Sequence, residues 1–144
     1  MLHLLSVISL FLFTPTHSAS FRKTNLKVEI QNVRVLEGMI HVALFRPGKD
    51  FPEGKPVEGR RMDVVSKSVQ MTFSVEPGDY AIAVYHDENG NGKMDKRMFG
   101  IPKEPYGFSN NFKPVMSAPK FSDCQFRVGD DGKVISIKLI SLLE

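Results

Sequence analysis

The alternation of apolar and polar residues predicts that this chain is built from β-strands. Leu26, Val28 and Ile30 are apolar and alternate with polar neighbours, which is the period of a half-buried strand. The spacing of amphipathic helices is largely absent. The pattern predicts seven strands, at residues 26–31, 39–46, 62–66, 69–75, 80–85, 121–128 and 134–142.

Turn residues separate these strands and limit the choice of fold. Glu37-Gly38 predicts a tight turn that pairs the first two strands, and residues 129–132 predict a closing hairpin. Residues 47–61 hold three prolines and three glycines and predict an exposed loop. Seven strands without a helix or repeat predict an all-β fold, an immunoglobulin-like or transthyretin-like β-sandwich. A small barrel is the alternative.

The N-terminal residues predict a signal peptide. The first twenty residues contain no Lys, Arg, Asp or Glu, and Leu4 to Phe13 form an apolar run. That run is about ten residues long, whereas a membrane-spanning helix needs about 20. We therefore predict a signal peptide at 1–20, a single domain at 21–144, and an exported protein, periplasmic or extracellular, without a transmembrane anchor. A basic residue before the run is missing, so a retained anchor or an N-terminal strand is the alternative.

Charge and cysteine content narrow the functional classes. The chain has 144 residues and a net charge of +3, and its basic residues never form runs longer than two. No basic stripe for nucleic acid or an anionic membrane is present, so we expect no nucleic-acid partner. Cys124 is the single cysteine, which excludes an internal disulfide, and we expect it to fill a small core position.

The most informative stretch is the acidic loop, residues 86–95, with the sequence His-Asp-Glu-Asn-Gly-Asn-Gly-Lys-Met-Asp. With Asp87 counted as position 1, oxygen-bearing groups stand at alternate positions of the loop. Gly92, at position 6, allows a sharp turn, as in calcium loops. Calcium is therefore the one cofactor that the sequence predicts. Its expected ligands are Asp87, Asn89, Asn91, the Lys93 carbonyl and Asp95.

The acidic loop departs from the EF-hand in two respects. Met98 stands where the bidentate glutamate would be, and the flanking segments are not helical. With two certain carboxylates, we expect a dissociation constant of about 10⁻⁴ to 10⁻³ M. Glu104 supplies a third carboxylate if the chain folds back. The alternative is a tight turn whose Asn and Asp side chains bond to their own backbone without an ion.

Residues 99–120 form a second candidate site, because a loop this long is usually functional or disordered and four aromatic residues argue against disorder. We expect this segment to fold over one end or edge of the sandwich and to present Tyr106, Asn110 and Asn111 beside the acidic loop. His86, Glu104, Tyr106 and Asn110 are the predicted ligand-binding residues. The alternative is that the aromatic side chains cap the core.

Two stretches, YAIAVYHDENGNGKMD at residues 80–95 and FGIPKEPYGFSNN at residues 99–111, give the chain a family resemblance. It resembles the domain of unknown function 2141 (DUF2141) family over residues 26–142. The resemblance implies a small exported bacterial β-sandwich and does not imply a substrate. It also implies a small core residue at Cys124, where relatives have alanine.

These observations predict a non-catalytic binding or interaction module of the cell envelope. Its partner would be an envelope protein or a small ligand. The alternative is a hydrolase that uses His86 and Asp87 with a nucleophile such as Ser109, although no nucleophile elbow is present. A zinc site built from His41, His86 and an aspartate is a third option, without a supporting ligand spacing.

Overall fold

The first predicted strand forms the centre of a three-stranded sheet in the computed structural model, which describes residues 22–142. β1 (Thr24–Gln31) pairs antiparallel with β4 (Val69–Val75) and parallel with β8 (Lys133–Lys138). Apolar residues of β1 and β4 alternate with exposed ones, as the sequence pattern predicts. This sheet therefore has one apolar and one polar face.

The second sheet is larger and carries the candidate site. β2 (Met39–Phe45) pairs antiparallel with the edge strand β3 (Glu58–Asp63) and with the long strand β5 (Gly78–Asp87). Two short strands, β6 (Tyr106–Phe108) and β7 (Phe126–Val128), pair with different stretches of β5. The order is β3-β2-β5-β6, with β7 beside β5.

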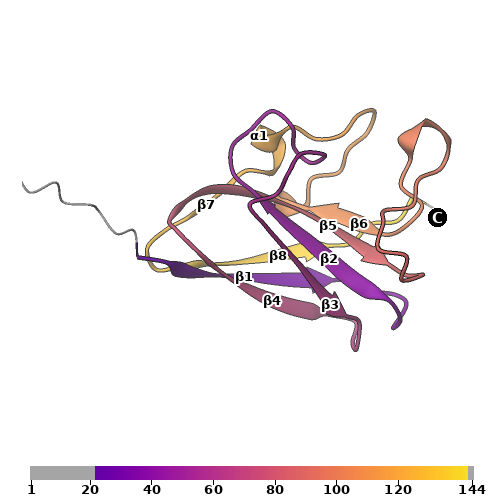
Figure 1. The fold of residues 1–144 in the computed structure, drawn as a ribbon, viewed down its shortest axis with the longest axis horizontal. Helices are drawn as coiled ribbons and strands as arrows, with labels where there is room; N and C mark the ends of the chain where they lie inside the picture. Colours follow the sequence, from indigo (N-terminus) through magenta and orange to yellow (C-terminus); the bar gives the residue numbers. More distant parts are fainter. Residues whose placement is uncertain (1–21, 143–144) are drawn as a thin grey trace, which may run out of the picture.

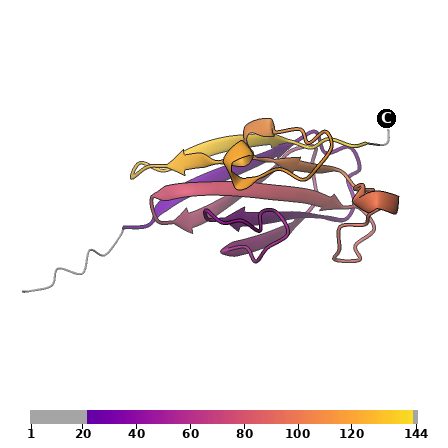
Figure 2. The ribbon, with the colours of Figure 1, turned by 90° about the horizontal axis from the view of Figure 1, so that it is seen from above.

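The two sheets pack face to face around one hydrophobic core, which confirms the predicted all-β sandwich (Figures 1 and 2). Leu26, Val28 and Ile30 from β1 meet Ile40 and Val42 from β2 in this core. The predicted signal peptide, residues 1–20, lies outside the described residues. In the part of the chain that the structure describes, no helix is long and apolar enough to cross a membrane.

Two predicted strand pairings are wrong. β1 and β2 belong to different sheets instead of forming a hairpin, and the turn at residues 129–132 joins β7 in one sheet to β8 in the other. Alternation shows that each strand has one apolar face, but it does not show whether two such strands lie side by side or across the core. Here their apolar faces meet across the core.

Several strand boundaries also differ from the prediction. β3 covers Glu58–Asp63 instead of 62–66, because this polar edge strand has no buried alternating face to mark it. The predicted strand at 121–128 is a short helix, α1 (Phe121–Cys124), followed by β7. Phe121 and Cys124, three residues apart, are both buried, and the Asp123 carboxylate accepts the Lys120 backbone N–H at 2.8 Å.

A second apolar cluster covers part of the outer face of the larger sheet. Phe51, from the loop between β2 and β3, packs edge-on against Phe121 of α1, with ring centroids 6.1 Å apart. Cys124 is fully buried in this cluster, as predicted, and burial raises the pKa of its thiol to about 12. Both faces of the larger sheet are thus partly apolar.

Candidate functional site

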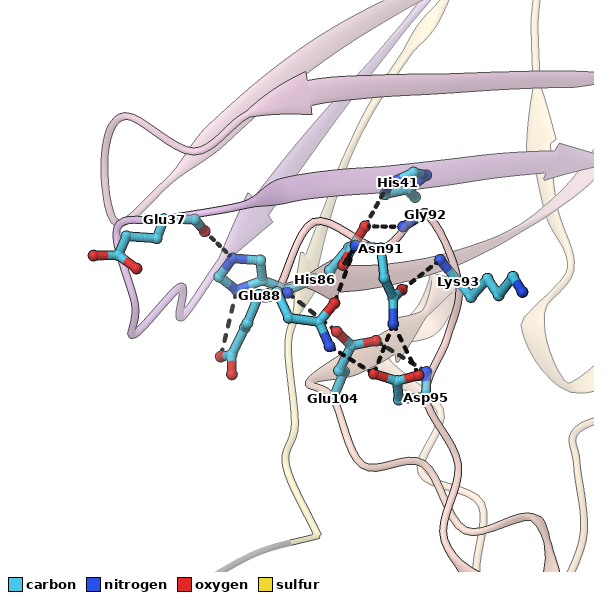
Figure 3. Close-up of polar contacts among 11 residues, drawn as sticks. Glu37, His41, His86, Glu88, Asn91, Gly92, Lys93, Asp95 and Glu104 are labelled. Carbon is cyan, nitrogen blue, oxygen red and sulfur yellow. Dashed lines mark hydrogen bonds and ion pairs between the residues drawn. The ribbon is translucent and has the colours of Figure 1, made fainter.

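Asp87, the last residue of β5, organises the acidic loop. Its side chain is buried, and its two oxygens accept the backbone N–H groups of Asn91 at 3.1 Å and Gly92 at 2.7 Å (Figure 3). Gly92 has a φ of 77°, which residues with a Cβ rarely adopt. The chain therefore turns back immediately beyond the strand.

Side-chain amides and carboxylates of the loop bond to one another. Asn89 Oδ1 accepts the Asn91 N–H at 3.0 Å, and Asn91 Oδ1 accepts the Lys93 N–H at 2.9 Å. The Asp95 carboxylate accepts the side-chain N–H groups of Asn89 and Asn91 at 2.7 and 3.0 Å, which hold its pKa below the ordinary value. The loop thus brings together the side chains of four predicted calcium ligands, while Lys93 supplies a backbone N–H.

Calcium binding at this loop stays a prediction. Within residues 22–142, no three His, Cys, Asp or Glu side chains are grouped as a metal site would require. The hydrogen bonds of Asp87 and Asp95 account for the shape of the loop without an ion. These bonds match the alternative of a self-bonded turn, and an ion would have to compete with them.

Glu104 folds back onto the acidic loop. Its buried carboxylate accepts the backbone N–H of Glu88 at 3.2 Å and that of Asp95 at 3.1 Å, on opposite sides of the turn. Burial raises the pKa of Glu104, and these two hydrogen bonds oppose the shift. The residue therefore joins the two ends of the loop.

Two other predicted site residues, His86 and Asn110, lie apart from each other. His86 is fully buried on the core face of β5, and its Nε2 lies 2.7 Å from the Glu37 carbonyl oxygen. Asn110 donates to the Gln125 carbonyl beside α1. Because β6 runs antiparallel to β5, Asn110 lies about six residues, or about 20 Å, along the sheet from Asp87 and not beside the acidic loop.

Tyr106 lies on the outer face of β6 and leads to a groove that the sequence reasoning missed. This groove has a volume of about 640 Å³. Its floor is a row of three paired positions without large side chains, Gly59, Ala43 and Ala83, on β3, β2 and β5. The sheet surface is therefore hollow at its centre.

A polar row crosses the sheet at one end of this floor. We define it as Arg61, His41, Tyr85 and Tyr106, which are register partners on β3, β2, β5 and β6. All four residues line the groove. The His41 ring stacks on Tyr85, with centroids 4.6 Å apart and planes inclined by 14°.

Two loops supply apolar walls. Phe99 is 93% exposed and has a φ of 64°, an unusual conformation for a bulky residue, and Val115 and Met116 from the other loop are almost fully exposed. These exposed side chains line the groove together with Met94, Ile101 and Pro114. Exposed apolar residues grouped in this way are a common feature of binding surfaces.

His41 connects the groove to the acidic loop. Its buried Nε2 lies 3.6 Å from Asp87 Oδ2, without a hydrogen-bond partner in the described structure (Figure 3). Burial lowers the pKa of His41, Arg61 lowers it further, and Asp87 raises it. The zinc option has no support here, because His41 and His86 are on opposite faces of the sheet.

The sequence contains a partial signal for the groove. Ala43, Ala81 and Ala83 are small residues at alternate positions opposite large core residues, which is the pattern of a hollow outer face. Their alignment with Gly59 and Tyr106 depends on strand register, which the sequence pattern leaves open.

The comparison with family models matches residues 28–136 to a family described as "Uncharacterized protein conserved in bacteria (DUF2141)". The chain belongs to this family. The DUF2141 match begins within β1 and ends within β8, so it includes both sheets, the acidic loop and the groove floor. No curated protein matches the chain, and no solved structure matches it.

Proposed function

We propose that this DUF2141 protein is a non-catalytic binding module exported to the cell envelope, and that the groove is its binding site. The groove is the observation that carries the proposal. Its volume of about 640 Å³ lies within the range of small-molecule sites, which is about 300–1,000 Å³. Its lining also has the usual character of such sites, being mainly apolar with a few polar groups.

The acidic loop has a supporting role in this proposal. Residues 94 and 96 line the groove, so the loop and its continuation form part of one wall. Asp87 and Glu104 fix the start and the end of this segment through backbone N–H groups. Because this wall is already held in place, the protein loses less conformational entropy when a ligand binds.

The hydrolase alternative has less support. His86 is fully buried and faces the core, away from the groove. Ser109 is also buried, and its hydroxyl oxygen accepts the Ile82 N–H at 2.9 Å and donates to the Cys124 carbonyl. A base and a nucleophile for acyl transfer need to be within hydrogen-bond reach of each other, and these two residues have other partners.

The test is binding of the neutral apolar dye N-phenyl-1-naphthylamine, followed by its fluorescence. We expect the native protein to bind the dye, and Ala43→Leu to abolish binding because the added side chain fills the floor. Gly59→Leu is a second variant on the edge strand, where a Cβ would meet nothing closer than the Val42 carbonyl oxygen at 4.0 Å.

Thr72→Leu is the matched control, since Thr72 is exposed on the outer face of the other sheet. It adds the same apolar side chain elsewhere and should leave dye binding unchanged. Absence of dye binding by the native protein, or equal loss in Thr72→Leu, would contradict the proposal. Melting temperatures of all variants establish that they are folded.

A further inference from the structure

Arg61 has an uncompensated charge at the rim of the groove. Among the described residues, no carboxylate lies within ion-pair distance of its guanidinium. The neighbouring basic residues are paired. Arg60 contacts Glu58 at 2.7 Å, and Lys96 contacts Glu53 at 3.1 Å. The polar row therefore begins with one free positive charge beside an apolar floor.

Two phenol groups continue the polar row. Tyr85 and Tyr106 are adjacent register partners, and neither hydroxyl has a hydrogen-bond partner within the described chain. Burial raises the pKa of both, and the carboxylates of Asp87 and Glu104 raise that of Tyr85 further, so both phenols are neutral donors near pH 7. A cation and two O–H donors thus line the same end of the groove.

The rest of the groove is suited to hydrocarbon. From the polar row, the floor continues over Ala43 and Ala83 toward Phe108. The exposed side chains of Phe99 and Met116 stand along it. A ligand tail lying on this floor would remove these apolar surfaces from water, which is favourable in proportion to the area buried.

We propose that the groove binds an amphiphilic anion of the fatty-acid class, with its carboxylate at Arg61 and its tail over Ala43 and Ala83. The inference rests on the proposed function and names its ligand. A guanidinium binds a carboxylate through two parallel hydrogen bonds, which favours this head group over a neutral or cationic one. The floor offers the tail only apolar surface, so we expect ligands with tails of different lengths to bind.

The test compares three ligands with the same twelve-carbon tail and different heads, namely dodecanoate, dodecanol and dodecyltrimethylammonium. Each is measured below its aggregation concentration by displacement of the neutral dye. We expect dodecanoate to bind at least tenfold more tightly than the other two. Arg61→Gln should weaken dodecanoate about tenfold, the loss of one charged hydrogen-bonding group, and leave dodecanol unchanged.

Arg127→Gln is the charge-matched control. Arg127 is exposed on β7, pairs with Asp79 at 3.2 Å and does not line the groove, so the variant should bind dodecanoate like the native protein. Equal affinity for the three ligands, or unchanged dodecanoate affinity in Arg61→Gln, would overturn the inference while dye binding still supports the groove. Binding to anionic lipid vesicles without binding of free dodecanoate would overturn it in favour of a membrane surface.

Discussion

At the residue scale, His41 and Asp87 connect the two parts of the candidate site. Asp87 is buried beneath the acidic loop and accepts two backbone N–H groups, while His41 lies 3.6 Å from it and lines the groove. A change in the charge of His41 therefore acts on both the loop and the groove floor. Its protonation state is the most direct way to test this connection.

The lowered pKa of His41 predicts a pH dependence of stability. Since burial places this pKa below the ordinary value of 6.5, the unfolded chain binds a proton more readily than the folded one. The contribution of His41 is thus fully present above pH 6.5 and is lost as the pH falls toward the folded value. We expect the melting temperature to fall more between pH 7.5 and pH 5 in the native protein than in His41→Gln. An equal fall in both proteins would contradict this assignment.

The placement of some site residues could be predicted from the local sequence, whereas the placement of others could not. The turn of the acidic loop depends on groups within a few residues of one another, such as Asp87 and Gly92, so spacing alone predicted its shape. The polar row depends on residues up to 65 positions apart, from His41 to Tyr106. Their meeting is a consequence of sheet register, and no local pattern contains it.

At the scale of the elements, long half-buried strands were predictable and short or polar ones were not. β1 and β4 have clear alternation; the predicted range of β4 is confirmed, and β1 begins two residues before its predicted start. β3 is exposed along most of its length and is held by backbone pairing to β2, while β6 has only three residues. Both edge strands contribute to the groove, which explains why the sequence reasoning did not find it.

The acidic loop is the element on which the calcium prediction depends. With a dissociation constant of about 10⁻⁴ to 10⁻³ M, 5 mM calcium should stabilise the folded protein by about 1–2 kcal/mol, a rise of several degrees in melting temperature. Asp95→Ala should remove this rise, because Asp95 is one of the two carboxylates that are expected to bind the ion. Glu53→Ala, an exposed carboxylate outside the loop, is the control and should retain it.

An unchanged melting temperature on adding calcium would make the acidic loop an ion-free turn held by its own hydrogen bonds. Magnesium at the same concentration separates a site from a general effect of divalent ions, since a flexible oxygen-rich loop favours the larger cation. Neither result tests the floor of the groove, which lies on the strands.

At the scale of the whole molecule, the sandwich accounts for the position of the groove. One face of the larger sheet is used for the core, and the other is only partly covered, by Phe51 and α1 at one end. Gly107 lets β6 approach β8, because a Cβ there would lie 2.9 Å from Ile137 Cγ2. The class of fold was predictable from alternation, whereas the order of the strands and the uncovered face were not.

The most direct test of the account is to map dye binding residue by residue. In ¹H–¹⁵N NMR spectra of the native protein titrated with N-phenyl-1-naphthylamine, we expect the shifted amides to cluster on the outer face of the larger sheet. His41, Ala43, Gly59, Ala83 and Tyr85 should be among them. Amides of β1 and β4 should not move. Shifts centred on the β4-β1-β8 sheet, or no saturable shifts, would contradict the proposal that the groove is the binding site.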